Sequence, residues 1–408
     1  PSCVFDGFPE IMFEKPPPGE YNCEEMVKKE VEPMADHTLS VSVRLGLEGI
    51  CADELRRLEF SDVRAENGRV LCTAGAAGLA RANLNLRTGE RVLLRLGRFP
   101  APDFDALYDG ARALPWADYI PKDGAFPIRG RCLDSALTSE QRCAAVIKAA
   151  VGDALGAAYG LERLPETGAE YQIRFFIFKD VMELYLDTSG EALHKRGYRA
   201  LGVHAPLRET LAAGMVLLSR YRGKDPFVDP FCGSGTIPIE AAFIAKNRAP
   251  GLNRRYSAQN WAWLPQRVWA EEQTRAKDLE FGGKYDILGS DVDPKAVQLA
   301  RENAAKAGVS DLVHFDVADA RTIAPQSFRG RVVTNPPYGE RLSDKAEAES
   351  LYRDFGRAWR KVPDGWSLTL LSSHTEFERT FGKKADKKRK IYNGMLKCDI
   401  FMYQNKDK

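Results

Sequence analysis

The residues Asn335-Pro336-Pro337-Tyr338, at the end of an apolar run, could hold a planar amine in a fixed position. They close the segment VVTNPPY, so we expect them at the carboxyl end of a strand. Two prolines fix the backbone, which lets the Asn335 side-chain oxygen and the Pro336 carbonyl point at one spot. Two such acceptors would bind an exocyclic amine and stabilise the positive charge that develops when the amine attacks an electrophile. Tyr338 would offer a face on which a flipped base can stack, worth ~1–3 kcal/mol.

A second motif, DPFCGSGTIPIEAA (229–242), predicts a strand, a tight turn on two glycines and a helix. Glycines suit such a turn because the backbone must bend sharply and approach a ligand without a Cβ in the way. The free N–H groups and dipole of the helix N-terminus attract a carboxylate by roughly 0.3–1 kcal/mol, and S-adenosylmethionine (SAM) carries one. The predicted SAM contacts in this motif are Asp229, Phe231, Gly233, Ser234, Gly235 and Thr236.

Other interpretations of this turn fit less well. It lacks the Gly-Lys-Ser/Thr ending of a P-loop, and Ser234 does not lie in the G-x-S-x-G pattern of a hydrolase. Cys232 could be a nucleophile, but packing beneath the turn is the interpretation we favour.

Two aspartates follow later predicted strands. Asp291, in ILGSDVDP, could accept both hydroxyls of a ribose, whereas Asp293 precedes a proline and is better explained as a helix N-cap. Asp319, in FDVADAR, could accept from the adenine amine of SAM or could simply close a turn. The distance from Gly233 to Asp291 exceeds the ~20 residues of a dinucleotide-binding fold. An insertion with three tryptophans accounts for the excess. These side chains could lie in the core, which is the interpretation we favour, or line a substrate cleft: Trp261, Trp263 and Trp269.

The elements that must position these motifs alternate between strand and helix from about residue 207, which predicts a doubly wound, mostly parallel sheet. The first half is a mixture of strands and helices. LSVSVRL (39–45) alternates as a strand does, 137–160 has helical spacing after Thr138 or Ser139, and a β-hairpin is predicted around Lys179-Asp180.

Composition narrows the class of protein. The 408 residues, 44% hydrophobic and 28% charged, suggest two or three globular domains. No window reaches the ~18 apolar residues of a membrane span and no secretory signal is evident, so we expect a cytoplasmic protein. Eight scattered cysteines without a C-x-x-C pair, and five histidines without a ligand pair, predict reduced thiols and no metal site.

Charge is unevenly distributed along the chain. The net charge is +2, yet residues 379–397 hold eight Lys and Arg against one Asp, and residues 81–98 hold five Arg against one Glu. Such runs are often solvated faces. In a nucleic-acid enzyme they would instead contact phosphates, and we expect this of 383–390.

The motifs resemble those of class I SAM-dependent amino-methyltransferases and, more closely, the bacterial THUMP-containing RNA methyltransferases related to the ribosomal large-subunit guanine-N2 enzymes. The resemblance covers about 39–408. It is carried by GLEGICADELRRL, RANLNLRTGERVLLRLG, LPETGAEYQIRF, DTSGEALHKRGYR, APLRETLAA and KADKKRKIYNG. It implies an α+β region of ferredoxin-like element plus THUMP RNA-binding domain (39–200), followed by a Rossmann-like α/β methyltransferase domain (201–408). Residues 1–38 match nothing in the family and are expected to be a poorly ordered extension or a loosely docked arm.

The sequence therefore predicts methylation of guanine N2 in 23S ribosomal RNA, with SAM as cofactor, RNA as partner and no membrane. Because N-P-P-Y serves either exocyclic amine, adenine N6 remains an alternative, as does a guanine of transfer RNA. A non-catalytic RNA-binding assembly factor is disfavoured, since the glycine turn and the tetrapeptide are both intact. The chain ends without the second methyltransferase domain of some relatives, so we expect one activity. Oligomeric state is not predicted.

Overall fold

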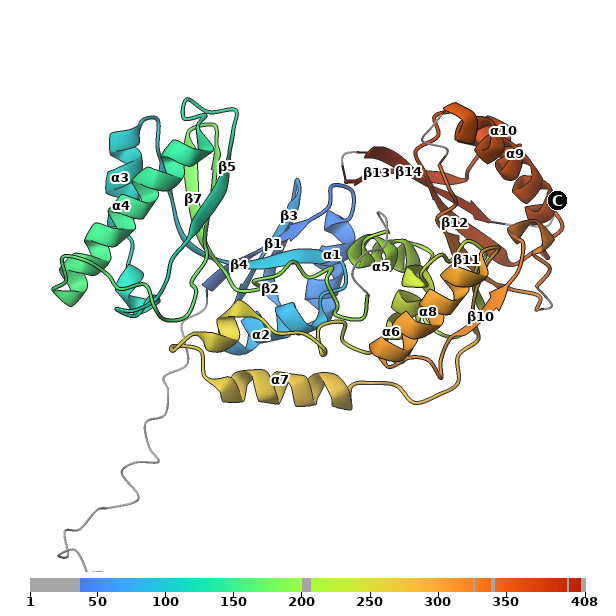
Figure 1. The fold of residues 1–408 in the computed structure, drawn as a ribbon, viewed down its shortest axis with the longest axis horizontal. Coiled ribbons are helices and arrows are strands. Elements are labelled where there is room, and N and C mark those ends of the chain that lie inside the picture. The colour runs from blue at the N-terminus through green and yellow to red at the C-terminus, as the bar shows by residue number, and fades with distance from the viewer. Residues whose placement is uncertain (1–36, 200–206, 326, 339–341, 395, 405–408) are drawn as a thin grey trace, which may run out of the picture. The chain divides into compact units, whose positions relative to one another are not determined.

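Two seven-stranded sheets organise the chain, as the computed structural model shows (Figure 1). The structure describes residues 37–199, 207–325, 327–338, 342–394 and 396–404. The predicted extension at 1–38 lies outside the described residues except for its last two, which already belong to the first strand. None of the described helices is long and apolar enough to cross a membrane.

The first sheet joins the predicted ferredoxin-like and THUMP regions into one surface, in the order β2-β3-β1-β4-β7-β6-β5. The long strand β4 pairs with β1 along one edge and with β7 along the other, so one strand serves both regions. Only β5 and β6 run parallel in this sheet. Its strands are β1 (His37–Val43), β2 (Ser61–Glu66), β3 (Arg69–Ala74), β4 (Gly89–Pro100), β5 (Ile128–Leu133), β6 (Ile173–Phe178) and β7 (Val181–Asp187).

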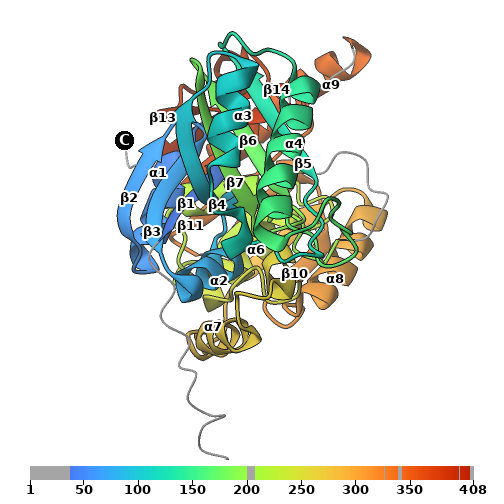
Figure 2. The same ribbon diagram turned by 90° about the vertical axis from the view of Figure 1, so that its left-hand side faces the viewer.

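Helices pack against one face of this sheet (Figure 2). They are α1 (Glu48–Arg57), α2 (Ala76–Asn85), α3 (Phe104–Arg112), the 3₁₀ turn η1 (Trp116–Asp118) and α4 (Glu140–Tyr159). Helix α4 begins where predicted, because the Ser139 side chain accepts from Arg142 N, and it ends at the left-handed Gly160. Lys179 and Asp180 both have positive φ and join β6 to β7, which confirms the predicted hairpin.

The second sheet has the order β10-β9-β8-β11-β12-β14-β13. The first five strands in this order, β10, β9, β8, β11 and β12, pair in parallel. Strands β14 and β13 are added antiparallel at one edge. This confirms the predicted Rossmann-like, mostly parallel arrangement. The strands are β8 (Phe227–Asp229), β9 (Ile287–Asp291), β10 (His314–Val317), β11 (Gly330–Thr334), β12 (Trp366–Ser372), β13 (Lys387–Asn393) and β14 (Leu396–Gln404).

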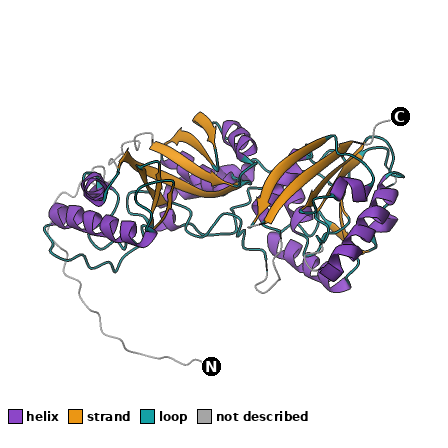
Figure 3. Cartoon of the chain, turned by 90° about the horizontal axis from the view of Figure 1, so that it is seen from above, coloured by secondary structure: helices purple, strands orange, loops and turns teal. Residues whose placement is uncertain are grey.

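Helices flank this sheet, and Figure 3 shows the strands of each sheet as a separate group with helices beside them. They are α5 (Glu209–Leu218), α6 (Thr236–Lys246), η2 (Ser257–Asn260), α7 (Gln266–Asp278), α8 (Pro294–Ala307), η3 (Ala320–Thr322), α9 (Leu342–Trp359) and α10 (Phe377–Phe381). The Asp293 carboxylate accepts from Lys295 N at the start of α8, which confirms its predicted role as N-cap.

The insertion between α6 and β9 packs against the first half of the chain. Trp261 and Trp269 are buried, which confirms the core interpretation for these two, and Trp263 is half-buried. Trp261 stacks on Tyr171 next to β6, with ring centroids 5.1 Å apart. Arg254 donates to the backbone carbonyls of 191, 192 and 195 at 2.6, 2.7 and 3.2 Å, so it fixes the segment that connects the two sheets.

Candidate active site

The carboxyl ends of four neighbouring parallel strands, β10, β9, β8 and β11, meet at one edge of the second sheet. Every predicted site residue lies at the end of one of these strands, in the loop that follows it or, for Thr236, at the start of the next helix. The structure therefore brings the glycine turn, the two aspartates and the Asn-Pro-Pro-Tyr segment to a single edge, which is where open α/β sheets bind their ligands.

The glycine turn is closed by backbone hydrogen bonds. Cys232 N donates to Ser290 O of β9 (2.9 Å), and Gly235 N donates to Cys232 O (2.8 Å). Gly233 and Gly235 have φ of +51° and +83°, which suits glycine. A Cβ on Gly235 would lie 2.9 Å from Ala300 Cβ, so helix α8 packs directly against the turn. Around Gly233 the same position is open.

Cys232 is buried beneath this turn, and burial raises the pKa of its thiol. This confirms the packing role and disfavours a nucleophile, which needs a thiolate. Among the described residues no cluster of side chains could hold a metal ion.

Asp229 lies under the turn as a buried carboxylate with one oxygen unpaired. Its Oδ1 accepts from Thr334 Oγ1 (2.6 Å) and from Phe231 N (3.2 Å), linking the ends of β8 and β11. Its Oδ2 has no hydrogen-bond partner among the described residues. Burial raises the Asp229 pKa to about 7, and the charge of Asp291 contributes in the same direction. A cation beside Oδ2 would stabilise the ionised carboxylate.

The Asp291 carboxylate, at the end of β9, accepts hydrogen bonds from two backbone N–H groups. Its Oδ2 accepts from Gly233 N (2.9 Å) and its Oδ1 from Asp293 N (3.0 Å). An ionised carboxylate has about four lone-pair positions, so acceptor capacity remains for two hydroxyl donors.

Asp319 follows β10 and pairs with Arg321. Its Oδ1 accepts from Arg321 N (2.8 Å) and caps η3, while both carboxylate oxygens pair with the Arg321 guanidinium. The hydrogen bond from Arg321 lowers the Asp319 pKa. The turn interpretation is therefore realised in this structure, and contact with an adenine amine stays a prediction.

The Asn335-Pro336-Pro337-Tyr338 segment follows β11 directly. The Tyr338 hydroxyl donates to Asn335 Oδ1, so one of the two predicted acceptors is already engaged within the segment. Asn335 Oδ1 keeps a second lone pair for an incoming amine. Tyr338 is partly buried against the core, and burial raises the pKa of its hydroxyl. From α9, Tyr352 donates to Pro337 O (2.6 Å) and braces the segment.

Sequence reasoning missed three supporting residues, Arg199, Asn303 and Tyr352. Arg199 donates to Thr236 Oγ1 (2.8 Å) at the start of α6, and its guanidinium lies 3.6 Å from Glu209 Oε1. Asn303 is fully buried in α8 and donates to Ser234 O (2.9 Å) in the glycine turn. None of them belongs to a motif with a local chemical signature, although GYR (197–199) is part of the family resemblance.

Comparison with known families matches three consecutive regions. Residues 38–93 match the RlmL ferredoxin-like domain, 101–187 the THUMP domain, and 196–401 the RMKL-like methyltransferase domain. The chain belongs to the THUMP-containing family of class I, SAM-dependent RNA methyltransferases.

Relatives of this methyltransferase align over most of it. "Putative RNA methyltransferase YpsC" of Bacillus subtilis (strain 168) is 39% identical over 91% of this chain and 97% of its own length. "Ribosomal RNA large subunit methyltransferase K/L" of Shewanella baltica is 35% identical over 88% of this chain, but the match spans only 52% of that relative. The chain thus corresponds to about half of the K/L enzyme.

Two solved structures share the fold of this methyltransferase. A predicted N6-adenine-specific DNA methylase from Listeria monocytogenes is 41% identical, with a TM-score of 0.86 over 91% of this chain and 96% of its own. SMU.472, a putative methyltransferase complexed with S-adenosylhomocysteine (SAH), is 36% identical, with a TM-score of 0.86 over 91% of this chain and 99% of its own. The methyltransferase uses SAM as its cofactor.

The geometry at the sheet edge fits this cofactor. The unpaired, buried Oδ2 of Asp229 suits a ligand that carries a positive charge. Above Gly233 a backbone without a Cβ leaves space for a ligand. Asp291 ends β9, the strand next to β8, and its remaining lone pairs suit the two hydroxyl groups of a ribose.

Proposed function

We propose that this methyltransferase transfers the methyl group of SAM to the exocyclic N2 amine of a guanine in 23S ribosomal RNA. The observation that carries the proposal is the position of Asn335 and Pro336, directly after β11 and beside the strand that ends in Asp229. The resemblance to the large-subunit guanine-N2 methyltransferases supports guanine as the target, and the similarity to the ribosomal RNA large subunit methyltransferase K/L supports ribosomal RNA as the substrate.

The roles of the site residues follow from their positions and are part of the proposal. SAM supplies an electrophilic methyl group. Asp229, the glycine turn and Asp291 would hold the methionine and ribose parts at the ends of β8 and β9. Asp319, once its ion pair with Arg321 is broken, would accept a hydrogen bond from the adenine amine at the end of β10.

At β11, Asn335 Oδ1 and the Pro336 carbonyl would accept the two N–H bonds of the target amine, so that its lone pair is aimed at the methyl group. As the new N–C bond formed, the bond between the methyl group and the sulfur of SAM would break and SAH would leave. These two oxygens would stabilise the positive charge on the amine nitrogen until it lost a proton to solvent. Because the Tyr338 hydroxyl occupies Asn335 Oδ1 in this structure, the amine must share that oxygen or displace the hydroxyl. The aromatic ring of Tyr338 would then stack on the base.

The domain assignment remains part of the proposal: residues 39–200 bind RNA and residues 201–408 carry the reaction. The protein would act in the cytoplasm, where bacterial ribosomal RNA and SAM are both found.

Adenine N6 methylation is the second candidate, favoured by the description of the Listeria relative as an N6-adenine-specific methylase. Nucleoside analysis by mass spectrometry separates the candidates. Purified 23S ribosomal RNA and transfer RNA from a deletion strain should be incubated with the protein and isotopically labelled SAM, then digested. We expect labelled N2-methylguanosine in 23S RNA. Labelled N6-methyladenosine would replace the proposal by the second candidate, and label confined to transfer RNA would reject ribosomal RNA as substrate.

A further inference from the structure

Strands β13 and β14, at the edge of the second sheet, contact the Asn-Pro-Pro-Tyr segment. The Tyr338 hydroxyl donates to Asn335 Oδ1 within the segment. The same hydroxyl has hydrogen-bond contacts with Asn393, the last residue of β13, and with Cys398 of β14. Cys398 is buried and belongs to the core against which the Tyr338 ring packs. The two strands therefore help to set the position of the ring on which the target base would stack.

The loop that follows β1 contacts β13 directly. Arg44 donates from Nη1 to the Tyr392 carbonyl at 2.7 Å. Gly46 O accepts from Arg389 Nη1 at 2.8 Å. The backbones also approach closely, because a Cβ on Gly46 would lie 2.5 Å from Lys390 O. This loop of the ferredoxin-like region thus fixes the backbone of β13 just before its last residue.

Glu90 holds Arg44 in place from β4, the strand shared by the ferredoxin-like and THUMP regions. Arg44 Nε donates to Glu90 Oε1 (3.1 Å), and the Arg44 side chain is only 9% exposed. Glu90 Oε1 also accepts from Thr210 Oγ1 of α5 (2.6 Å), and Oε2 lies 3.1 Å from His194 Nδ1. Because His194 lies between β7 and α5, one carboxylate joins the first sheet, the connecting segment and the first helix of the second half.

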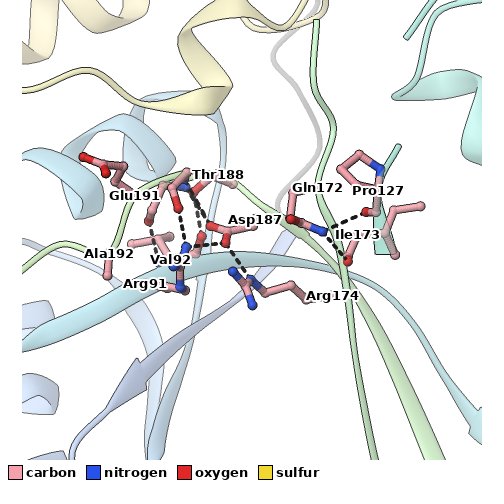
Figure 4. A network of polar contacts seen from close by, with 12 residues as sticks. Arg91, Val92, Pro127, Gln172, Ile173, Arg174, Asp187, Thr188, Glu191 and Ala192 are labelled. Carbon is pink, nitrogen blue, oxygen red and sulfur yellow. Dashed lines mark hydrogen bonds and ion pairs between the residues drawn. The ribbon is translucent and has the colours of Figure 1, made fainter. Parts of the chain in front are cut away.

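The strand that carries Glu90 is itself well supported (Figure 4). Arg91, the next residue of β4, pairs with the fully buried Asp187 at the end of β7 (2.6 Å). Thr188 donates to the Val92 carbonyl from both its N (3.1 Å) and its Oγ1 (2.7 Å). Glu90 therefore lies on a backbone fixed by its neighbours, and its carboxylate gives Arg44 a partner in a constant position.

We propose that Arg44 and Glu90 are positioning residues for methyl transfer, which act on Tyr338 through β13. They act on the strand and not on the substrate itself. This inference rests on the proposed function in that it takes Tyr338 to stack on the target base. It goes beyond that function because it makes the ferredoxin-like region necessary for the speed of the chemical step.

Arginine suits this role because its planar guanidinium presents several N–H donors in a rigid fork. Arg44 uses Nε for Glu90 and Nη1 for the Tyr392 carbonyl, so the two acceptors are held at a fixed separation. A lysine would keep the charge beside Glu90, but its single nitrogen on a flexible stem would not keep this geometry. Loss of the link should therefore displace Tyr338 and slow the reaction, while the binding of SAM and RNA stays intact.

The first test measures single-turnover methylation of RNA by the full chain. Arg44→Gln and Arg44→Lys should each lower the rate by about 10- to 100-fold, the upper value being that for a displacement of ~1 Å. Affinities for SAM and RNA should stay within about twofold of wild type. Arg44→Lys should also keep its melting temperature within about 3 °C, since a cation remains beside Glu90. Misfolding would then not explain its slow reaction.

Two further variants bracket this effect. Glu90→Gln keeps an oxygen for Arg44 Nε but loses the charge, so it should lower the rate by only about 2- to 10-fold. Arg56→Gln is the matched control, because Arg56 also pairs with a carboxylate of the first half, that of Asp53, but both side chains are exposed. Exposed pairs contribute little, and this variant should react as wild type.

Hydrogen exchange tests the link without any reaction. Amides of β13 and β14 should exchange at least about 10-fold faster in Arg44→Gln than in wild type, because β13 loses a partner that fixes its backbone. Amides of α8, which lies at the other end of the second sheet, should exchange as in wild type.

A double-mutant cycle tests whether the link ends at Tyr338. Asn393→Ala removes the contact between β13 and the Tyr338 hydroxyl, and it should slow methyl transfer as Arg44→Gln does. Tyr338→Phe removes the hydroxyl itself. If Arg44 acts through this hydroxyl, the double variant Arg44→Gln, Tyr338→Phe should react no more slowly than Tyr338→Phe alone, within about twofold.

Independent losses that multiply in the double variant would overturn the proposal. Unchanged exchange of β13 in Arg44→Gln, or an equal loss of rate in Arg56→Gln, would do the same. Methylation by the wild type separates this inference from the proposed function. If the wild type methylates RNA and Arg44→Gln does so at the same rate, only the role of Arg44 and Glu90 is rejected. If the wild type methylates no RNA, the proposed function fails, and the role in methyl transfer fails with it.

Discussion

The buried carboxylate of Asp229 offers the sharpest test of the cofactor site, through the change Asp229→Asn. Asparagine keeps the shape of the side chain, and its Oδ1 can still accept from Thr334 and Phe231 N. The change removes only the ionisable oxygen, Oδ2, which has no partner among the described residues. We therefore expect a folded variant that differs from wild type in its response to pH and to SAM.

The magnitude follows from the raised pKa of Asp229, about 7 against an ordinary 3.8, which burial causes. Because the folded-state pKa is the higher one, the stability contributed by the neutral carboxyl is fully present below about pH 4 and is lost as pH rises through 7. A difference of about three pH units corresponds to about 4 kcal/mol. The free wild-type protein should lose up to this amount of unfolding free energy between pH 4 and 8, and Asp229→Asn should lack that component.

Binding of SAM should reverse this effect if the cationic ammonium of its methionine part lies beside Oδ2. Ionisation of Asp229 then becomes favourable, and the proton it carries in the free protein is released. At pH 6 the wild type should release about 0.9 proton per SAM bound, whereas at pH 7.5 the net release should be close to zero, because the α-amino group of free SAM (pKa ~7.8) then takes up about as many protons as Asp229 loses. Titration calorimetry in two buffers of different ionisation enthalpy measures these numbers directly.

Asp229→Asn should show no such proton release, and its SAM affinity at pH 7.5 should fall about 10- to 150-fold, the range for one charge-assisted hydrogen bond. Asp293→Asn is the matched control, because Asp293 caps α8 and asparagine caps equally well. It should behave as wild type. Wild-type protein that releases no proton at pH 6, or an Asp229→Asn variant that releases as many protons as wild type, would refute the placement of the ammonium beside Asp229.

Three further predictions concern the remaining site residues and the basic strand. Asn335→Ala should lower the single-turnover rate of methyl transfer by about 100-fold or more while SAM affinity in calorimetry stays within about twofold; near-normal turnover would contradict its role. Asp291→Ala should do the reverse, weakening SAM binding at least 10-fold, and unchanged affinity would move the ribose contact elsewhere. Lys384→Gln with Lys387→Gln should reduce the salt dependence of RNA binding by about 1.4 in log–log slope, and an unchanged slope would make these lysines a solvated surface.

The structure reduces what we expect from the basic run at 383–390. Lys388 is paired with Glu378 (2.7 Å), and Arg389 donates to Gly46 O (2.8 Å) in the first half of the chain. These two charges have structural partners, so Lys384 and Lys387 are the better phosphate candidates. The last four residues of the run, 387–390, begin the edge strand β13, where lysines discourage pairing with another chain. A count of charges along the sequence could not distinguish these uses.

Features that depend on local chemistry were predictable from sequence. The N-cap of α8, the start of α4 at Ser139 and the β6–β7 hairpin all depend on residues within a few positions of each other. The alternation of strands and helices after residue 207 was also evident, because buried parallel strands are continuous apolar runs. Each predicted motif follows one of these strands. Because the carboxyl ends of neighbouring parallel strands lie at the same edge of a sheet, the motifs were expected to lie together.

Features that depend on distant residues were not predictable. The continuity of the first sheet rests on β4 pairing with β7, and nothing local to either strand specifies that partner. The support of the glycine turn by Asn303 joins positions 69 residues apart. The unpaired oxygen of Asp229 is likewise a property of the surrounding packing, since the motif DPF says only that an acid is present.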